Sequence, residues 1–353
     1  MLGPVAFSGA GRMVRASVSC YAGRTAMAWL LRGETPKKKH RLSGGLARKR
    51  EMHMRLLTFF KDSRESVGVV CDDGLRVLCL PSAAQHYAMP GIPLNMLDIV
   101  RQNEQSVPAI RKLLAQAQAD SSCPSLLLLE GLNILAPYKN PPRNVLCVGL
   151  NYYAHILEFE QAGGSVPTSP IFFTKPFTAL ADPDTAVDAH TAETSRYDYE
   201  TELAVVIGKS GKNIPREKAY EHVFGYSILN DMSARDVQTR TSQWYSGKCL
   251  DESAPWGPYL VHKDSVGNPH NLDILCLING EERQKSNTSL MIFDIPTIIS
   301  TFSQGTTLLA GDIIATGTCP GVGMGMNPPT FLKPGDSMEM TIERVGTLRN
   351  TLR

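Results

Sequence analysis

The sequence of 353 residues predicts an α+β protein that is mainly β: a mixed β-sandwich or roll with a small N-terminal α+β module. Segments with strand character outnumber helical segments, and they do not alternate regularly with helices as a doubly wound sheet requires. A composition of 42% apolar and 20% charged residues is typical of globular proteins and is sufficient for a sizeable core.

The first fifty residues differ from the rest in charge. They carry eleven Lys or Arg and one acid, Glu34, which leaves the remainder with 25 bases, 33 acids and a net charge of −8. A basic, acid-poor segment without a long apolar run favours a mitochondrial transit peptide, and a disordered basic arm is the alternative. Its longest apolar patch, "AMAWLL", is too short to span a bilayer.

Residues 54–136 predict the small N-terminal module. "MRLLTFF" (54–60) and "SVGVVCDDGLRVLCL" (66–80) have strand character, with Asp73-Gly74 as a hairpin turn. "NMLDIVRQNE" (95–104) and "VPAIRKLLAQAQ" (107–118) show the spacing of apolar residues expected of helices. The Pro-rich segment 136–144 then predicts a linker.

Residues 140–353 predict the larger, catalytic domain. It begins with "VLCVGLNYYAH" (145–155), an apolar strand, a Gly turn and a short helix. Helices are expected at "PREKAYEHV" (215–223), with Pro at its start, and "IPTIISTFS" (295–303). Further strands are expected at 170–176, 200–208, 225–231, 312–318 and 336–352, and a hairpin with an Asn-Gly turn at 271–284.

Composition also limits the function. The acidic body is a poor general binder of nucleic acid, and no segment predicts a membrane span. Of eight cysteines, Cys20 lies in the basic segment and the other seven are scattered without a C-x-x-C pair. That arrangement excludes a zinc ribbon or disulfide scaffold and favours a reduced compartment, with most cysteines as small core residues.

Glu200-x-Glu202 is the first candidate for chemistry. On a strand the two side chains share a face, with about 6–7 Å between their backbone positions. Their carboxylates can converge on one hard cation of the Mg²⁺, Ca²⁺ or Mn²⁺ kind. A solvated strand face is the alternative, because such pairs are common on surfaces.

Other polar residues adjoin predicted strands and turns. Asp231 follows an apolar strand and is either a third metal ligand or the N-cap of a helix over "SARDVQTR". His155 and Glu158, spaced i, i+3, are either a general base with its orienting carboxylate or a surface pair. Lys248 is either a group that stabilises enolate charge or a solvated lysine.

The Gly-rich segment "ATGTCPGVGMG" (315–325) predicts a backbone cradle for a carboxylate. It lacks the G-K-[ST] ending of a P-loop and does not match G-x-G-x-x-G. Nucleotide-binding loops of these two kinds are therefore excluded.

Taken in order, these segments resemble one family over residues 140–350. The motifs are "CVGLNYYAH", "PIFFTKP", "ETELAVVIGK", "GYSILNDMSARDVQ", "GK", "NGEERQ", "GDIIATGTCPGVG" and "LKPGD". They resemble the fumarylacetoacetate hydrolase superfamily. Within that superfamily, the N-terminal module and the C-terminal segment are most similar to the fumarylacetoacetate hydrolase domain-containing proteins of type 2. Proteins of this type are mitochondrial oxaloacetate tautomerases.

The resemblance implies a role for each matching residue and a homodimer. In the family, the Glu-x-Glu pair and the following Asp bind Mg²⁺ or Mn²⁺, and the His-x-x-Glu dyad lies on a lid segment. The matching positions are Glu200, Glu202 and Asp231 for the metal, His155, Glu158 and Lys248 for catalysis, and Arg235, Gln238 and Thr318 for the substrate. The family pattern gives Asp198, one pleat before Glu200, no ligand role, so it is expected to be the solvated end of that strand face.

Three positions depart from the family pattern. Ala154 stands where Asp often precedes the histidine, and Cys319 is inserted in the "TGTP" block. Leu150 stands where some acylpyruvate-cleaving members have Arg. These departures put the lid capping, the register around Thr318 and acylpyruvate cleavage in doubt.

The implied chemistry is that of 1,3-dicarbonyl acids. A divalent cation stabilises the enolate of such an acid, and His155 moves a proton. Enol–keto tautomerisation of oxaloacetate in the mitochondrial matrix is the leading hypothesis. C–C hydrolysis of acylpyruvates and oxaloacetate decarboxylation use the same groups, and a catalytically silent, metal-stabilised scaffold is the alternative outside enzymes.

Overall fold

The computed structural model describes residues 53–158 and 166–353. The predicted transit peptide or basic arm, residues 1–50, lies outside the described residues. Residues 159–165, which follow Glu158, lie outside them too. The described residues belong to one compact unit.

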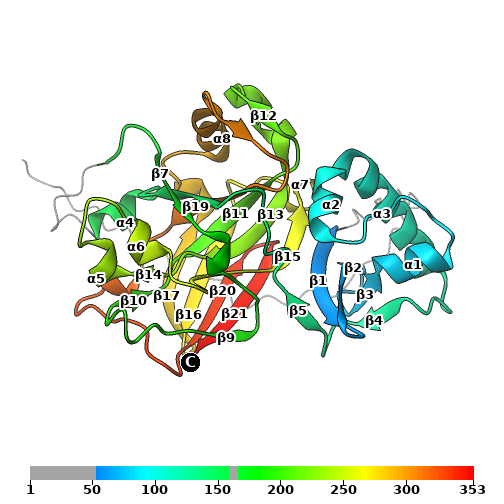
Figure 1. The fold of residues 1–353 in the computed structure, drawn as a ribbon, viewed down its shortest axis with the longest axis horizontal. Coiled ribbons are helices and arrows are strands. Elements are labelled where there is room, and N and C mark those ends of the chain that lie inside the picture. Colours follow the sequence, from blue (N-terminus) through cyan, green and yellow to red (C-terminus); the bar gives the residue numbers. More distant parts are fainter. Residues whose placement is uncertain (1–52, 159–165) are drawn as a thin grey trace, which may run out of the picture. The chain divides into compact units, whose positions relative to one another are not determined.

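A large mixed sheet runs through this unit (Figure 1). Its twelve strands follow the order β4-β3-β2-β1-β15-β13-β11-β19-β6-β7, with β5 beside β1 and β8 beside β15. The strands are β1 Arg55–Lys61, β2 Arg64–Val70, β3 Arg76–Cys79, β4 Leu126–Leu128, β5 Asn133–Leu135, β6 Val145–Gly149, β7 Ile171–Lys175, β8 Leu180–Ala181, β11 Thr201–Ile207, β13 Val223–Asn230, β15 Ala254–His262 and β19 Ile313–Thr318.

A second sheet, in the order β17-β16-β20-β21-β9, packs against the first. Leu203 and Tyr226 of the large sheet share a core with Ile274 and Met340 of the small one. Two short pairs, β10-β14 and β12-β18, complete the sheets. The strands are β9 Thr185–Val187, β10 Tyr197–Asp198, β12 Gly211–Lys212, β14 Ser233–Ala234, β16 Asp273–Ile278, β17 Glu281–Asn287, β18 Thr307–Leu308, β20 Ser337–Ile342 and β21 Gly346–Leu352. This arrangement confirms the predicted mainly β sandwich.

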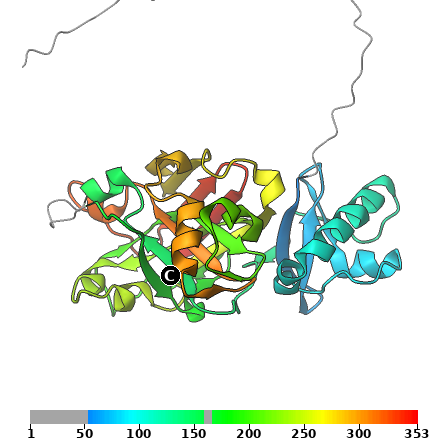
Figure 2. The ribbon, with the colours of Figure 1, turned by 90° about the horizontal axis from the view of Figure 1, so that it is seen from above.

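Helices cover the parts of the large sheet that the small sheet leaves open. Figures 1 and 2 both show α1, α2 and α3 lying beside β1, β2 and β3. The α-helices are α1 Leu80–His86, α2 Met96–Arg101, α3 Asn103–Ala119, α4 Tyr153–Leu157, α5 Arg235–Gln238, α6 Tyr245–Lys248, α7 Lys263–Val266 and α8 Ile295–Ser303. The 3₁₀ helices are Phe177–Ala179, Arg216–His222, Thr288–Leu290 and Gly323–Gly325.

Strand β11 is buried on both faces because of these two layers. Leu203, Val205 and Ile207 belong to the core between the sheets, whereas Ala204 and Val206 belong to the core on the helical side. Alternating residues of a strand face opposite ways, so a run without polar residues suits this central position.

Strand β1 connects the predicted N-terminal module to the larger domain. Arg55 and Leu56 pair with Val261 and Leu260 of β15, so the strands of residues 54–136 extend the large sheet. The predicted helix at 215–223 is the 3₁₀ helix Arg216–His222, which Pro215 precedes.

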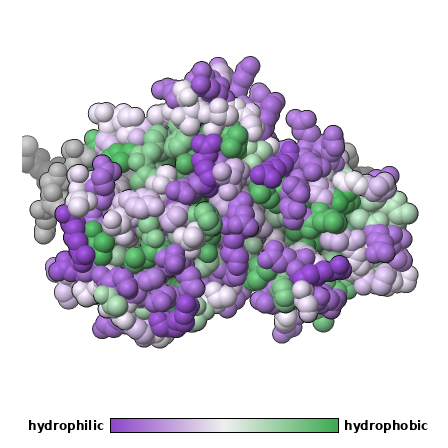
Figure 3. Space-filling view, viewed as in Figure 1, coloured by the Kyte–Doolittle hydropathy of each residue, from purple (hydrophilic) through white to green (hydrophobic). Residues whose placement is uncertain are grey.

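The surface is mostly hydrophilic on the face that Figure 3 shows, where apolar residues form smaller areas between polar ones. Among the described residues, no helix has the length and apolar character that crossing a bilayer requires.

Candidate active site

Three acids meet where two neighbouring strands end. Glu200 immediately precedes β11, Glu202 lies in it, and Asp231 immediately follows β13. These strands are antiparallel, so the start of β11 lies beside the end of β13, and Asp231 N–H donates to Glu200 C=O at 2.9 Å. All three side chains are buried, and each offers an oxygen within 4.8 Å of the others. The solvated-face interpretation of Glu200 and Glu202 is therefore wrong.

Two buried lysines hold these carboxylates. Lys248 Nζ donates to Glu200 Oε2 at 2.6 Å and to Asp231 Oδ2 at 2.8 Å. Lys175 Nζ, at the end of β7, lies 3.0 Å from Asp231 Oδ1 and donates to Met232 C=O at 2.9 Å. Asp231 is not the N-cap of the following helix, because α5 begins after Ala234, which makes no side-chain cap. Lys248 is not a solvated lysine either.

Burial and charge act differently on the two glutamates. Burial alone would raise the pKa of Glu200, but Lys248 and Arg235 lower the pKa to about 2. Burial, Asp231 and Glu200 together raise the pKa of Glu202 well above its usual value. Glu202 accepts a hydrogen bond from Gly317 N–H at 2.7 Å. Two cationic side chains thus balance the charge of Glu200, whereas this hydrogen bond to Glu202 comes from a backbone N–H group.

This donor set fits a hard divalent cation. Among the described residues, four buried carboxylates (Asp198, Glu200, Glu202, Asp231) lie beside three cationic groups (Lys175, Arg235, Lys248), so the carboxylates outnumber the cations. Asp231 Oδ1 is paired with the Lys175 ammonium at 3.0 Å and makes no further hydrogen bond within the described part of the chain. Ligands that are all oxygen favour Mg²⁺, Ca²⁺ or Mn²⁺ over zinc. We conclude that Glu200, Glu202 and Asp231 are suited to hold one such ion.

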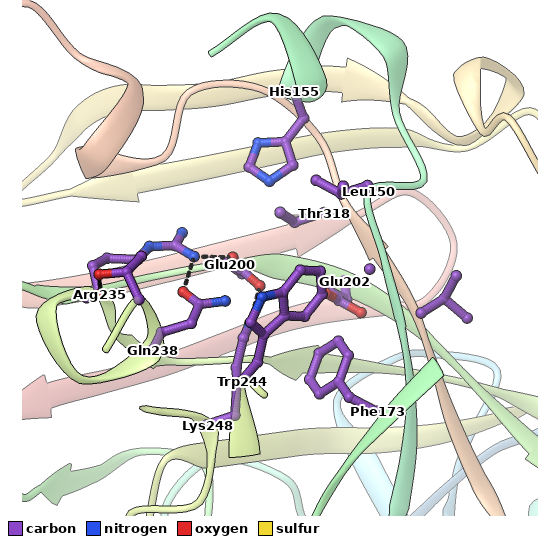
Figure 4. Close-up of a pocket in the computed structure, with 13 residues that line it drawn as sticks. Leu150, His155, Phe173, Glu200, Glu202, Arg235, Gln238, Trp244, Lys248 and Thr318 are labelled. Atoms are coloured by element: carbon purple, nitrogen blue, oxygen red, sulfur yellow. Dashed lines mark hydrogen bonds and ion pairs between the residues drawn. The ribbon is translucent and has the colours of Figure 1, made fainter. Parts of the chain in front are cut away.

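His155 and Glu158 form the predicted pair. His155 lies in α4 with its Nδ1 2.7 Å from Glu158 Oε2, and the residue is 4% exposed. Glu158 Oε1 accepts a hydrogen bond from Gly321 N–H at 2.6 Å, which fixes the carboxylate from the other side. The burial of His155 excludes a simple surface pair, and Figure 4 shows the ring pointing toward Thr318 and the pocket.

Arg235 connects several of the candidate residues. Its Nη1 lies 2.7 Å from Glu200 Oε1 and donates to Gln238 Oε1 at 3.2 Å, while its Nε donates to Asp198 Oδ2 at 2.9 Å. Asp198 was expected to be the solvated end of the strand face, and that expectation is wrong. Asp198 is fully buried and also accepts hydrogen bonds from Gly323 N–H at 2.7 Å and Met324 N–H at 3.0 Å.

Thr318 ends β19 and pairs in register with Glu202. Its hydroxyl donates to Thr201 C=O at 3.1 Å and accepts from Gln284 Nε2 at 2.8 Å. The inserted Cys319 is buried in the core between the sheets, and its carbonyl also accepts from Gln284. The insertion therefore leaves Thr318 on the wall of the pocket.

These residues surround one cavity of about 280 Å³ (Figure 4). Polar groups come from α4, α5, α6 and β11, and an apolar wall includes Leu150, Phe173 and Trp244. Phe173 and Trp244 pack edge to face, with 5.6 Å between their ring centroids. Lys175, Phe173 and Trp244 were missed by the sequence reasoning. Nothing about their spacing singled them out, although Phe173 and Lys175 stand in the quoted motif "PIFFTKP".

Fold and site together define a class of protein: a mainly β enzyme with an oxygen-ligand site for a divalent cation beside a histidine–glutamate pair. Residues 144–353 match the family model described as fumarylacetoacetate (FAA) hydrolase C-terminal. The chain belongs to this family, as the sequence predicted.

Named relatives carry both tautomerase and hydrolase descriptions. Oxaloacetate tautomerase YisK of Bacillus subtilis is 41% identical over 293 residues, covering 82% of this chain and 97% of that protein. Oxaloacetate tautomerase FAHD2A, mitochondrial, of Homo sapiens is 41% identical over 263 residues, covering 74% and 80%. Maleylpyruvate hydrolase of Sphingobium sp. SYK-6, solved with manganese(II) ion and pyruvate, is 29% identical with a TM-score of 0.66, covering 85% of this chain and 98% of that one.

Proposed function

We propose that this protein is a mitochondrial, Mg²⁺-dependent enzyme that interconverts the enol and keto forms of oxaloacetate. The observation that carries the proposal is the shared pocket: Glu200 and Glu202 line the same cavity as the oriented His155, and Asp231 offers a carboxylate oxygen within 4.8 Å of theirs. The two tautomerase relatives, one of them named mitochondrial, support the substrate and the address.

Glu200, Glu202 and Asp231 would hold Mg²⁺, with Mn²⁺ as the alternative. When bound, such an ion supplies Lewis-acid stabilisation of charge on the oxygens of an enolate. The lysines that already pair with Glu200 and Asp231 keep these carboxylates in place.

His155 would carry the proton. Its Nδ1 is engaged by Glu158, so the proton exchanged with the substrate is carried on Nε2. In the ketonisation direction, one proton leaves the enol oxygen and one is added to C3, so the composition of the acid is unchanged. The carboxylate of Glu158, fixed by Gly321 N–H, keeps the imidazole oriented.

The remaining polar residues would bind the acid. Arg235 and Gln238 present donors on one side of the cavity, and Thr318 lies across from them. Lys248 uses two N–H groups on Glu200 and Asp231, and its third can reach an oxygen on which enolate charge develops.

The decisive assay follows the absorbance of enol-oxaloacetate and the formation of products, with and without Mg²⁺. We expect Mg²⁺-dependent acceleration of tautomer relaxation without stoichiometric pyruvate. Stoichiometric pyruvate from an acylpyruvate, with tautomer relaxation unchanged, would instead establish the hydrolase. Pyruvate and CO₂ from oxaloacetate would establish the decarboxylase.

His155→Ala tests whether the pocket is catalytic at all. Loss of a general base costs typically 10²–10⁴-fold in rate, so we expect kcat to fall by about that factor. His86→Ala, an exposed histidine at the end of α1, is the matched control. Equal inactivity of the wild type and His155→Ala on a panel of diketo acids would support a metal-stabilised scaffold.

The mitochondrial address rests on residues 1–50 and is tested separately. We expect residues 1–50 fused to a fluorescent protein to direct it to mitochondria, and a fusion with these basic residues replaced by Gln to remain outside. Uniform distribution of the first fusion would contradict a transit peptide.

A further inference from the structure

We propose that Trp244 limits the length of the substrate, so that the site binds compact four-carbon keto acids and excludes longer acylpyruvates. The identity of the short substrate rests on the proposed function. The exclusion itself rests on the shape of the cavity.

The cavity has a polar and an apolar side. Arg235 and Gln238 lie on the polar side, where the carboxylate and keto oxygens of an acid find donors. Trp244 and Phe173 stand together on the other side (Figure 4). A ligand anchored by the polar groups and the acid cluster therefore extends its far end toward the indole.

The indole has no room to retreat toward β6. A Cβ added at Gly149 would lie only 2.4 Å from Trp244 Cζ3, so the ring lies directly against the glycine backbone. Phe173, at 5.6 Å between ring centroids, supports the ring in an edge-to-face contact. Placing even one additional methylene group in an interior packed this closely costs free energy.

The backbone that carries Trp244 is also fixed. Trp244 immediately precedes α6, whose last residue is the buried Lys248 that bridges Glu200 and Asp231. Within α6, a Cβ added at Gly247 would lie 2.5 Å from the backbone nitrogen of Gln238, so α6 and α5 are in close contact. The contacts that hold Lys248 and Gln238 thus also fix the position of the indole.

Direct binding separates this inference from the proposed reaction. Oxalate is the short probe and 2,4-dioxoheptanoate the long one, each titrated calorimetrically into the full chain with saturating MgCl₂. The variants are Trp244→Ala, which removes the wall, and Trp244→Phe, which keeps most of its bulk. Tyr245→Ala is the matched control, because this neighbouring aromatic is 52% exposed and does not line the cavity.

We expect Trp244→Ala to increase the affinity for the long probe relative to oxalate by at least tenfold, the scale on which pockets discriminate added methylenes. Trp244→Phe is expected to change this ratio less than Trp244→Ala, and Tyr245→Ala to leave it unchanged. An unchanged ratio in Trp244→Ala would overturn the inference. Wild-type protein that binds oxalate but does not accelerate tautomer relaxation would overturn only the proposed function.

Discussion

Asp198 shows how one buried carboxylate connects two parts of the site. It accepts from Arg235 Nε and from two backbone N–H groups of the segment 321–325, the segment that also fixes Glu158. Burying a charge is costly unless several donors satisfy it, and here Tyr199 N–H brings the number of donors to four. Asp198 is therefore a positioning residue for Arg235.

Replacing Asp198 by Asn removes the charge that orients Arg235. A charge-assisted hydrogen bond contributes roughly 1.5–3 kcal/mol, so we expect KM for oxaloacetate to rise by about tenfold or more, with a smaller change in kcat. Steady-state kinetics measures both, and Asp62→Asn, whose side chain is 74% exposed, is the control. An unchanged KM would show that Arg235 holds its place without Asp198.

Lys175 supports Asp231 from the side opposite Lys248. Its ammonium group is fully buried, so Lys175→Met would leave Asp231 with one cationic partner. Breaking a buried ion pair costs roughly 3–5 kcal/mol, and we expect a loss of this order in the free energy of unfolding. Denaturant titration checks it, with the exposed Lys209→Met as control. Equal losses in the two variants would contradict a supporting role.

At the scale of elements, the register between β11 and β13 creates the site. Thr201 pairs with Asn230, so residues just before one strand and just after the other lie together. The sequence predicted both strands from their apolar runs. It left open whether the adjoining acids are solvated, because the neighbours that bury them come from β7, α6 and β19.

Strand β15 shows where prediction from local pattern failed. It contains Pro255, Gly257 and Pro258, residues that argue against a central strand. The ladder accommodates them where its register shifts: Tyr226 pairs with Val261, but Ile228 pairs with Gly257. A bulge of this kind is a tertiary solution that no local propensity indicates.

We expect His262, the last residue of β15, to make the free energy of unfolding depend on pH. Burial lowers the pKa of His262 to about 4, and the neutral ring accepts a hydrogen bond from Asp264 N–H. The unfolded chain, with a His pKa near 6.5, binds more protons between these values, so stability is present above about pH 6.5 and decreases as pH falls toward 4.

We expect this single group to remove about 2 kcal/mol between pH 8 and pH 5. His262→Gln keeps an acceptor without a titrating group, and its free energy of unfolding should vary less over that range by this amount. Parallel pH profiles for the wild type and His262→Gln would show that other groups are responsible.

At the scale of the whole molecule, the acidic body favours cation binding. A ligand that binds only the folded state, present at a concentration of a hundred times its Kd, adds about 2.7 kcal/mol to the free energy of unfolding. We therefore expect saturating Mg²⁺ to raise Tm by several degrees in the wild type and in the surface variant Glu281→Ala. In Glu200→Ala the shift should be lost. A full Mg²⁺ shift in Glu200→Ala would refute the metal assignment.

We also propose the homodimer that the family resemblance implies. Light scattering on the purified full chain measures the mass in solution directly. A mass near 77 kDa, twice the 38.6 kDa of one chain, is expected, and a monomer at micromolar concentration would contradict it.

The sequence by itself determined the mainly β class and the nine candidate residues, because alternating apolar runs and ordered motifs are local properties of the chain. It also predicted the family before any geometry was known. His155 and Glu158 were paired correctly because they stand three positions apart, which places them on one helical turn.

Only the tertiary structure decided what those residues contact. Asp198 became a buried anchor rather than a solvated end, and Lys175 and Trp244 joined the site without a motif that marked them. The physical reason is that burial and charge pairing depend on which distant segments pack together. Segments around residues 175, 200, 231, 248 and 318 meet in one pocket only when the strands have taken their register.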